Sequence, residues 1–176
     1  NFYVGDGSTL TYFADSHKEI VFSTTGIALL VRNNAFFRSG EITNSSTHNT
    51  RSGCYFFGYS NNNMFLYAYS GGTIEVYSSS FDGLYKPIPS ITAYQQIGGS
   101  GRIIIWNSIL NGVGVTNNLN CDLYNLYLCY GSGSMGIAAM GTMNKITVNS
   151  WAYGIYSNFG NITASNVIIN NCAYAV

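Results

Sequence analysis

The sequence has few charged residues, since Asp, Glu, Lys and Arg together make up 8% of its 176 positions. A typical soluble domain carries about 25%. Asn, Ser, Thr, Gly and Tyr must therefore supply the surface polarity, a mixture common in extracellular and viral fibre proteins. Seven basic residues balance seven acidic ones. Because no excess of positive charge is available for phosphate groups, nucleic-acid binding is not expected.

Long apolar runs are also missing. The longest near-candidate, at 27–31, has the length of a strand, whereas a transmembrane helix needs roughly 18 apolar residues. Membrane insertion is therefore not expected. The first nine residues lack a charged start followed by an apolar stretch, so no signal peptide is predicted at this point.

Metal-binding and nucleophile motifs are absent as well. The four cysteines show no CxxC spacing, so we expect no metal or other cofactor, and buried free thiols are favoured over a disulfide between neighbouring segments. His17 and His48 are not accompanied by a GxSxG motif. Both are interpreted as loop histidines.

A repeat appears when residues 146–155 are aligned with residues 167–176, an offset of 21 positions. The same pattern recurs at 104–113, 126–130 and 74–84. Alternating apolar residues indicate short strands with one buried face, and Asn or Ser after them suits a sharp corner in the left-handed backbone region. The inward positions predicted in this way are Ile74, Val76, Ile104, Trp106, Leu126, Leu128, Ile146, Val148, Val167 and Ile169.

Further short strands at 119–123 and 160–164 would give three strands and three corners in about 21 residues. This arrangement predicts an all-β parallel β-helix, or β-solenoid, whose coils stack about 4.8 Å apart. We expect one domain over 1–176, with an irregular lead-in at 1–29 and an inserted loop at 85–101. Helices are opposed by composition, and a propeller or a sandwich is a lesser alternative. The last repeat lacks a cap, so the domain is expected to be a segment of a longer chain or to be continued by a partner.

Residues 73–176 resemble the right-handed pectin-lyase-like β-helices, a superfamily that includes pectate lyases, phage tailspikes and fibres, and secreted adhesins. The segment Tyr3-Val-Gly-Asp-Gly-Ser-Thr9 is similar to the Gly-Asp-Gly-x-Thr motif that precedes tailspike β-helices. Here Leu10-Thr-Tyr-Phe-Ala follows, where that family has acidic residues and an Ala-rich helix. The resemblance implies a right-handed solenoid that assembles as a homotrimer.

Catalytic candidates are sparse. The predicted outward row of the first strand holds one acid, and its members are Glu75, Ile105, Tyr127, Thr147 and Ile168. Polysaccharide lyases of the resembled superfamily use clustered carboxylates, and glycosidases need a carboxylate pair. Asp82 is the nearest partner for Glu75, seven residues and one corner away. Arg102 and Asp122 are expected to form an ordinary salt bridge.

The aromatic content, at 15%, is more informative. Tyrosine rings are apolar in body and polar at the tip, which suits stacking on sugars or burial in an interface. The ligand-binding candidates are Tyr67, Tyr69, Tyr77, Tyr85 and Tyr94. The outward residues Ile105, Tyr127 and Ile168 would form an apolar stripe, which is typical of a subunit interface.

The sequence therefore predicts a non-enzymatic structural or receptor-binding module, such as a tailspike, viral fibre or adhesin, at the cell exterior or on a virion. Its expected partners are a cell-surface polysaccharide and further copies of itself. The alternative is a polysaccharide depolymerase of the same fold, either a lyase or a glycoside hydrolase.

Overall fold

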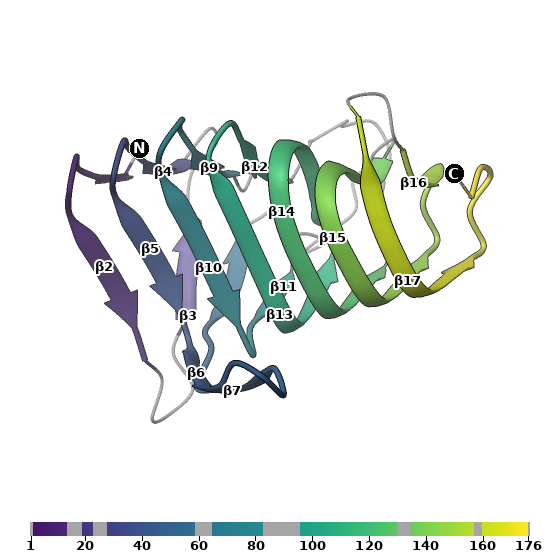
Figure 1. The fold of residues 1–176 in the computed structure, drawn as a ribbon, viewed down its shortest axis with the longest axis horizontal. Helices are drawn as coiled ribbons and strands as arrows, with labels where there is room; N and C mark the ends of the chain where they lie inside the picture. Colours follow the sequence, from purple (N-terminus) through teal and green to yellow (C-terminus); the bar gives the residue numbers. More distant parts are fainter. Residues whose placement is uncertain are drawn as a thin grey trace.

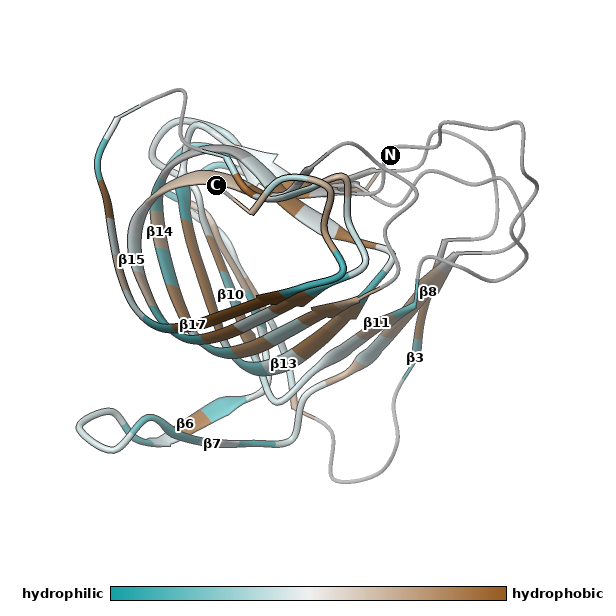
Figure 2. Cartoon of the chain, turned by 90° about the vertical axis from the view of Figure 1, so that its right-hand side faces the viewer, coloured by the Kyte–Doolittle hydropathy of each residue, from teal (hydrophilic) through white to brown (hydrophobic). Residues whose placement is uncertain are grey.

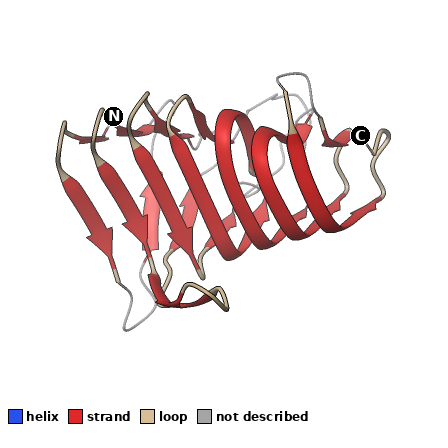
Figure 3. Ribbon diagram, viewed as in Figure 1, coloured by secondary structure: helices blue, strands red, loops and turns tan. Residues whose placement is uncertain are grey.

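A computed structural model of the chain describes residues 2–13, 19–22, 28–58, 65–82, 96–129, 135–156 and 160–175. The regular elements in these ranges are all β-strands (Figure 3), and none of the ranges contains a helix that could span a membrane. Fifteen strands form one sheet and two form a separate hairpin. In chain order the strands are β1 (Phe2–Val4), β2 (Thr9–Tyr12), β3 (Glu19–Phe22), β4 (Ala28–Val31), β5 (Phe36–Ser39), β6 (Glu41–Asn44), β7 (Asn49–Arg51), β8 (Tyr55–Gly58), β9 (Phe65–Ala68), β10 (Thr73–Tyr77), β11 (Ser80–Asp82), β12 (Gln96–Gly99), β13 (Arg102–Asn111), β14 (Gly114–Cys129), β15 (Met135–Asn149), β16 (Tyr153–Ile155) and β17 (Ile162–Asn170).

The large sheet wraps around one axis, and strands that are distant in sequence lie side by side and parallel (Figures 1 and 2). In the C-terminal half, Ser108 pairs with Leu126, Leu126 with Ile146, and Ile146 with Val167. Each residue thus meets its neighbour after 18, 20 and 21 positions in turn. An all-β, parallel, solenoid-like architecture, as predicted from the repeat, is confirmed.

Three stacks of paired strands form the wall of the solenoid. We call them face A (β1, β4, β9, β12, the starts of β14 and β15, and β16), face B (β2, β5, β10, the first half of β13, the middle of β14 and of β15, and the first half of β17) and face C (β3, β8, β11, the ends of β14 and β15, and the second halves of β13 and β17). Face B is toward the viewer in Figure 1.

The corner between faces B and C is made by residues in the left-handed backbone region. Asn107 (φ 53°), Asn125 (φ 49°), Lys145 (φ 57°) and Asn166 (φ 52°) occupy equivalent places on successive coils. Asn tolerates this conformation better than most residues. The side chains also bond between coils, because Asn125 Nδ2 donates to Asn107 Oδ1 at 2.9 Å. The predicted corner residues Ser78, Asn107, Ser150 and Asn171 all have positive φ. They belong to two different corners, however, since Ser78 and Asn107 lie between faces B and C and Ser150 and Asn171 follow face C.

The interior is filled by apolar side chains stacked in register from coil to coil. Phe56 and Phe81 pair across β8 and β11, and their rings lie parallel with centroids 4.2 Å apart. Both side chains are fully buried. Further down the same row, Leu110, Leu128 and Val148 continue the stack. Figure 2 shows the hydrophobic stretches alternating with polar ones along these strands.

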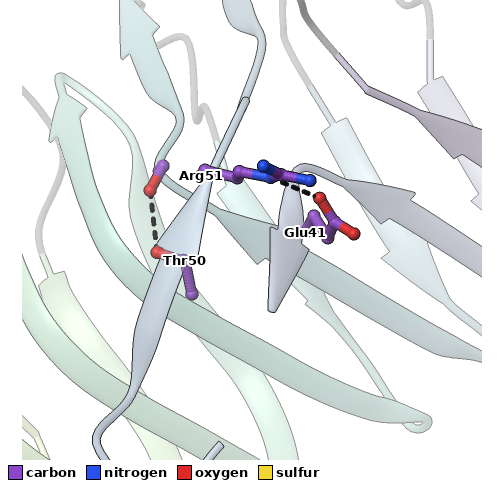
Figure 4. Close-up of polar contacts among 4 residues, drawn as sticks. Glu41, Thr50 and Arg51 are labelled. Atoms are coloured by element: carbon purple, nitrogen blue, oxygen red, sulfur yellow. Dashed lines mark hydrogen bonds and ion pairs between the residues drawn. The ribbon is translucent and has the colours of Figure 1, made fainter. Parts of the chain in front are cut away.

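The hairpin of β6 and β7 lies outside the coil, beside the bend between faces B and C (Figure 2). Arg51 Nε and Glu41 Oε2 are 2.6 Å apart and join its two strands (Figure 4). Thr50 Oγ1 lies 2.7 Å from the Ser78 hydroxyl and ties the hairpin to the corner. The hairpin covers a small second core made of Tyr77, Ile104 and Trp106, with Ile42 and Tyr124 packed against it.

This cover corrects the predicted inward face of β13. Ile103 and Ile105 are the inward residues, both 0% exposed. Ile104 and Trp106, predicted to face inward, belong instead to the cluster under the hairpin. Because both faces of this strand are buried, its four consecutive apolar residues carry no usable alternation.

The same register corrects the predicted alignment of the repeats. Leu126 pairs with Ser108, and Ile104 pairs with Asp122. The predicted 22-residue repeat step from Ile104 to Leu126 is therefore wrong, because Ile104 lies on face B and Leu126 on face C. The left-handed corner residue Asn107 interrupts the alternation of inward and outward side chains. Ile105 and Ser108 therefore both face inward, although they are three positions apart.

The N-terminal residues do not form an irregular lead-in. β1, β2 and β3 pair in parallel with β4, β5 and β8. The prediction for 1–29 is thus wrong in the described parts of that range. Of the predicted loop at 85–101, residues 85–95 lie outside the described residues, and Gln96–Gly99 forms β12 between β9 and β14.

Candidate functional site

The predicted ligand-binding tyrosines differ in location and exposure. Tyr77 is 1% exposed beneath the hairpin, where burial raises the pKa of its hydroxyl. Tyr85 and Tyr94 lie outside the described residues. Tyr67 and Tyr69 are 36% and 42% exposed, and their ring centroids lie 5.1 Å apart in an edge-to-face arrangement. Among the predicted tyrosines that the structure describes, Tyr67 and Tyr69 are the two that are exposed, and they lie next to each other.

Residues from two neighbouring coils lie beside this pair on face A. Tyr3 in β1 pairs with Leu30 in β4, which pairs with Tyr67 in β9. Residues in one such row project from the same side of a parallel sheet. Tyr3 is 47% exposed, whereas Leu30 between the two tyrosines is only 9% exposed. Two steps of 27 and 37 residues along this row thus bring Tyr3 and Tyr67 to one surface, with Leu30 between them.

A pocket of about 290 Å³ opens next to this surface, lined by Asp6, Arg32, Asn33 and Tyr69. The lining residues come from the turns that join faces A and B on successive coils. These turns bond to each other, since Gly7 N donates to Asn33 O at 3.2 Å and Asn34 N to Gly71 O at 3.0 Å. We call Tyr3, Tyr67, Tyr69 and the pocket residues Asp6, Arg32 and Asn33 the tyrosine corner.

Gly71 is required by this packing. Its φ is +78°, and a Cβ placed there would lie 2.1 Å from Asn33 Oδ1. A larger residue would both strain the turn and displace the Asn33 side chain. The position of one pocket residue is therefore fixed from the next coil.

Two charged side chains of the tyrosine corner, Asp6 and Arg32, are available to a ligand. The described ranges contain two ion pairs, Arg38 with Glu75 and Arg51 with Glu41. Asp6 and Arg32 line the same pocket and are both exposed, but they are not among these pairs. The Arg32 guanidinium carbon lies 4.9 Å from the centroid of the Tyr3 ring. A carboxylate acceptor and a guanidinium donor thus face one pocket beside aromatic rings.

The predicted catalytic carboxylates are engaged elsewhere. Glu75 Oε2 lies 2.5 Å from Arg38 Nε on face B, and this hydrogen bond raises the pKa of Arg38. Asp82, on face C, accepts hydrogen bonds from Tyr55 Oη at 3.1 Å and from Asn111 Nδ2 at 3.3 Å. The two carboxylates therefore belong to different faces and different polar networks.

Other predicted polar residues also have structural surroundings. Asp122 accepts a hydrogen bond from Thr142 Oγ1 at 3.3 Å, and its predicted salt bridge with Arg102 is not one of the two ion pairs in the described ranges. His48 stacks on Tyr124 with ring centroids 4.0 Å apart and an interplanar angle of 17°. His17 lies outside the described residues.

Two of the three residues of the predicted apolar stripe are exposed. Tyr127 and Ile168 lie in one outward row of face C and are 39% and 55% exposed. Ile105 is wrong for this row because it is 0% exposed in the interior. Ile109 pairs with Tyr127 and is 49% exposed, so it takes that place. The stripe therefore consists of Ile109, Tyr127 and Ile168, with Thr147 between the last two.

The four cysteines, Cys54, Cys121, Cys129 and Cys172, are free thiols, as predicted. Burial raises the pKa of Cys121 to about 12. Within the described ranges, no three His, Cys, Asp or Glu side chains form a group that could hold a metal ion. No protein-family model, no curated protein and no solved structure matches this chain.

Proposed function

We propose that this chain is a structural and glycan-contacting module of an extracellular or virion-surface protein, and that it contacts glycans through the tyrosine corner. The observation that carries the proposal is the exposed pair Tyr67 and Tyr69 beside a pocket lined by Asp6, Arg32 and Asn33. We also propose that its solenoid is a right-handed β-helix of the pectin-lyase-like kind, as in tailspikes, fibres and adhesins. Its basic coil would have about 21 residues, with insertions such as the β6–β7 hairpin.

Sugar recognition requires two kinds of group in one place. Aromatic rings offer an apolar face to the C–H groups of a pyranose, while carboxylate, amide and guanidinium groups bond its hydroxyls. Binding sites for small ligands generally combine apolar walls with a few convergent polar groups. The tyrosine corner has this composition, and its polar groups come from turns that are bonded to one another.

Binding can be tested with the Tyr69→Ala variant in a saturation-transfer NMR screen of bacterial and animal oligosaccharides. We expect binding by the native protein and at least a tenfold weaker affinity for the variant, because ring stacking is lost. Tyr174→Ala is the matched control, since Tyr174 is also exposed, at 59%, and stacks on one other tyrosine. Equal binding by both variants would contradict the proposed site.

The same proposal includes self-association through face C, with a second and a third copy of the chain covering the stripe of Ile109, Tyr127 and Ile168. Exposed apolar rows of this kind commonly mark interfaces. A chain with 8% charged residues is also easier to keep in solution when part of its surface is covered. We expect a trimeric mass by light scattering, and dissociation when Ile109 and Ile168 are both changed to Thr.

A polysaccharide depolymerase remains the competing function, and it has its own test. Release of reducing ends or unsaturated sugars from a host polysaccharide, abolished by Glu75→Gln or Asp82→Asn, would replace the binding proposal. The present geometry favours binding, because Glu75 is paired with Arg38 and Asp82 is bonded to Tyr55 and Asn111.

A further inference from the structure

We infer that the pocket of the tyrosine corner selects an uncharged sugar unit over a uronic acid or an amino sugar. This inference rests on the proposed glycan-binding function and specifies its ligand class. It follows from the presence of one carboxylate, Asp6, and one guanidinium, Arg32, in the lining of one pocket.

The formal charges of these two groups cancel, yet they are not joined in an ion pair. Each sugar hydroxyl is both a donor and an acceptor. Asp6 can accept from one hydroxyl while Arg32 and the Asn33 amide bond to another. An uncharged sugar therefore satisfies both groups without bringing a net charge into the pocket.

Charged sugars fit less well for reasons that concern each group separately. A uronate carboxylate that pairs with Arg32 enters a pocket that already contains the Asp6 carboxylate. An amino sugar that pairs with Asp6 brings its ammonium group toward Arg32. Like charges about 4 Å apart in water repel by about 1 kcal/mol, or roughly a fivefold change in affinity, and this repulsion offsets the attraction to the opposite charge. A charged sugar therefore gains no net Coulomb energy in the pocket, yet it loses part of the hydration of its charge.

The pocket also limits the size of the ligand. Its volume of about 290 Å³ lies just below the range of about 300–1,000 Å³ that is usual for small-molecule sites. One or two sugar units can occupy it, and the exposed rings of Tyr67 and Tyr3 can extend the contact along face A. We therefore expect recognition of a chain end or a single branch.

The experiment compares three trisaccharides by isothermal titration calorimetry: one of glucose, one of galacturonic acid and one of glucosamine. Native protein should bind the glucose trisaccharide more tightly than either charged one, because a charged sugar loses hydration without a net Coulomb gain. Raising NaCl from 50 to 500 mM should leave the affinity for glucose trisaccharide unchanged within twofold, because no net charge is matched.

Two charge variants make the inference specific to these residues. Asp6→Asn should improve galacturonate binding about fivefold relative to glucose, and Arg32→Gln should improve glucosamine binding by a similar factor. Both residues are exposed on turns, and a thermal melt checks that folding is retained. Glu41→Gln, which removes an acid from the hairpin instead, is the control and should leave the preference unchanged.

The outcomes separate the two proposals. Tighter binding of the uronate or the amino sugar by native protein, or an unchanged preference in Asp6→Asn and Arg32→Gln, would overturn the neutral-ligand inference while leaving glycan binding in place. Failure of native protein to bind any oligosaccharide, both here and in the wider screen, would overturn glycan binding itself.

Discussion

Two isoleucines on β13 provide a direct test of the register of the solenoid. Ile105 is 0% exposed in the interior, whereas Ile109, four positions later on the same strand, is 49% exposed on face C. The corner residue Asn107 lies between them. Changing each isoleucine to Ala in turn removes the same atoms from opposite sides of one wall.

The expected losses of stability differ clearly. Ile105→Ala removes a fully buried side chain and leaves a cavity between stacked coils, which costs about 2–5 kcal/mol in the free energy of unfolding. Ile109→Ala removes a half-exposed side chain that closes no cavity. It should cost about 1 kcal/mol or less.

The assay is urea unfolding followed by the fluorescence of Trp106 and Trp151, which are both buried. Each variant is measured at two protein concentrations tenfold apart, so that an effect of Ile109 on self-association appears as a concentration dependence. Equal losses for the two variants at the lower concentration, or a larger loss for Ile109→Ala, would refute the register.

Three further predictions concern individual side chains. Asn107 has a φ of 53°, a left-handed conformation that is unfavourable for Ala but not for Gly. Asn107→Ala should therefore be about 1 kcal/mol less stable than Asn107→Gly in urea unfolding, and equal stabilities would contradict the corner geometry. Burial raises the pKa of Cys121 from 9.0 to about 12, so the folded state keeps a proton that the unfolded state loses. This contribution is present below pH 9 and is lost as the pH rises toward 12; a thiol reagent at pH 8 should label Cys172 first and Cys121 only on unfolding, and rapid labelling of Cys121 in the folded protein would exclude its burial. His48 packs 4.4 Å from Trp106, between ring centroids, so His48→Ala should expose the indole and shift its emission to longer wavelength, whereas an unshifted spectrum would mean that the hairpin does not cover this tryptophan.

The C-terminal coils could be predicted from the sequence because their lengths are nearly constant. Ile146 and Val167 were matched directly, and they are paired in the structure. The N-terminal coils could not be recognised, since the step from Phe37 to its neighbour Ile74 is 37 residues and includes the β6–β7 hairpin. An insertion of that size removes the regular spacing on which the search for repeats depends.

The tyrosine corner was predicted only in part, for a related reason. Tyr67 and Tyr69 stood out by residue type, but Asp6 and Arg32 gave no local signal. They reach one pocket because β1, β4 and β9 stack in register, across steps of 27 and 37 residues. Ile109 was missed because the left-handed residue Asn107 shifts the alternation by one position, and this shift becomes visible only when the backbone is known.

Both the tyrosine corner and the stripe on face C depend on the stacking of all the coils along one axis. Thr11 and Thr163 occupy the same outward row of face B, separated by six strand-to-strand steps through Arg38, Glu75, Ile104, Asp122 and Thr142. Six steps of about 4.8 Å give about 29 Å, and the five steps from Thr11 to Thr142 give about 24 Å.

The most direct measurement is therefore the distance between spin labels, obtained by pulsed electron paramagnetic resonance, on Thr11→Cys with Thr163→Cys and on Thr11→Cys with Thr142→Cys, with the four native cysteines replaced by Ala. Stacked coils predict distances near 29 and 24 Å, with the first pair longer by about one strand spacing. Equal distances for the two pairs, or a separation beyond about 40 Å for either, would contradict the stacking of these coils.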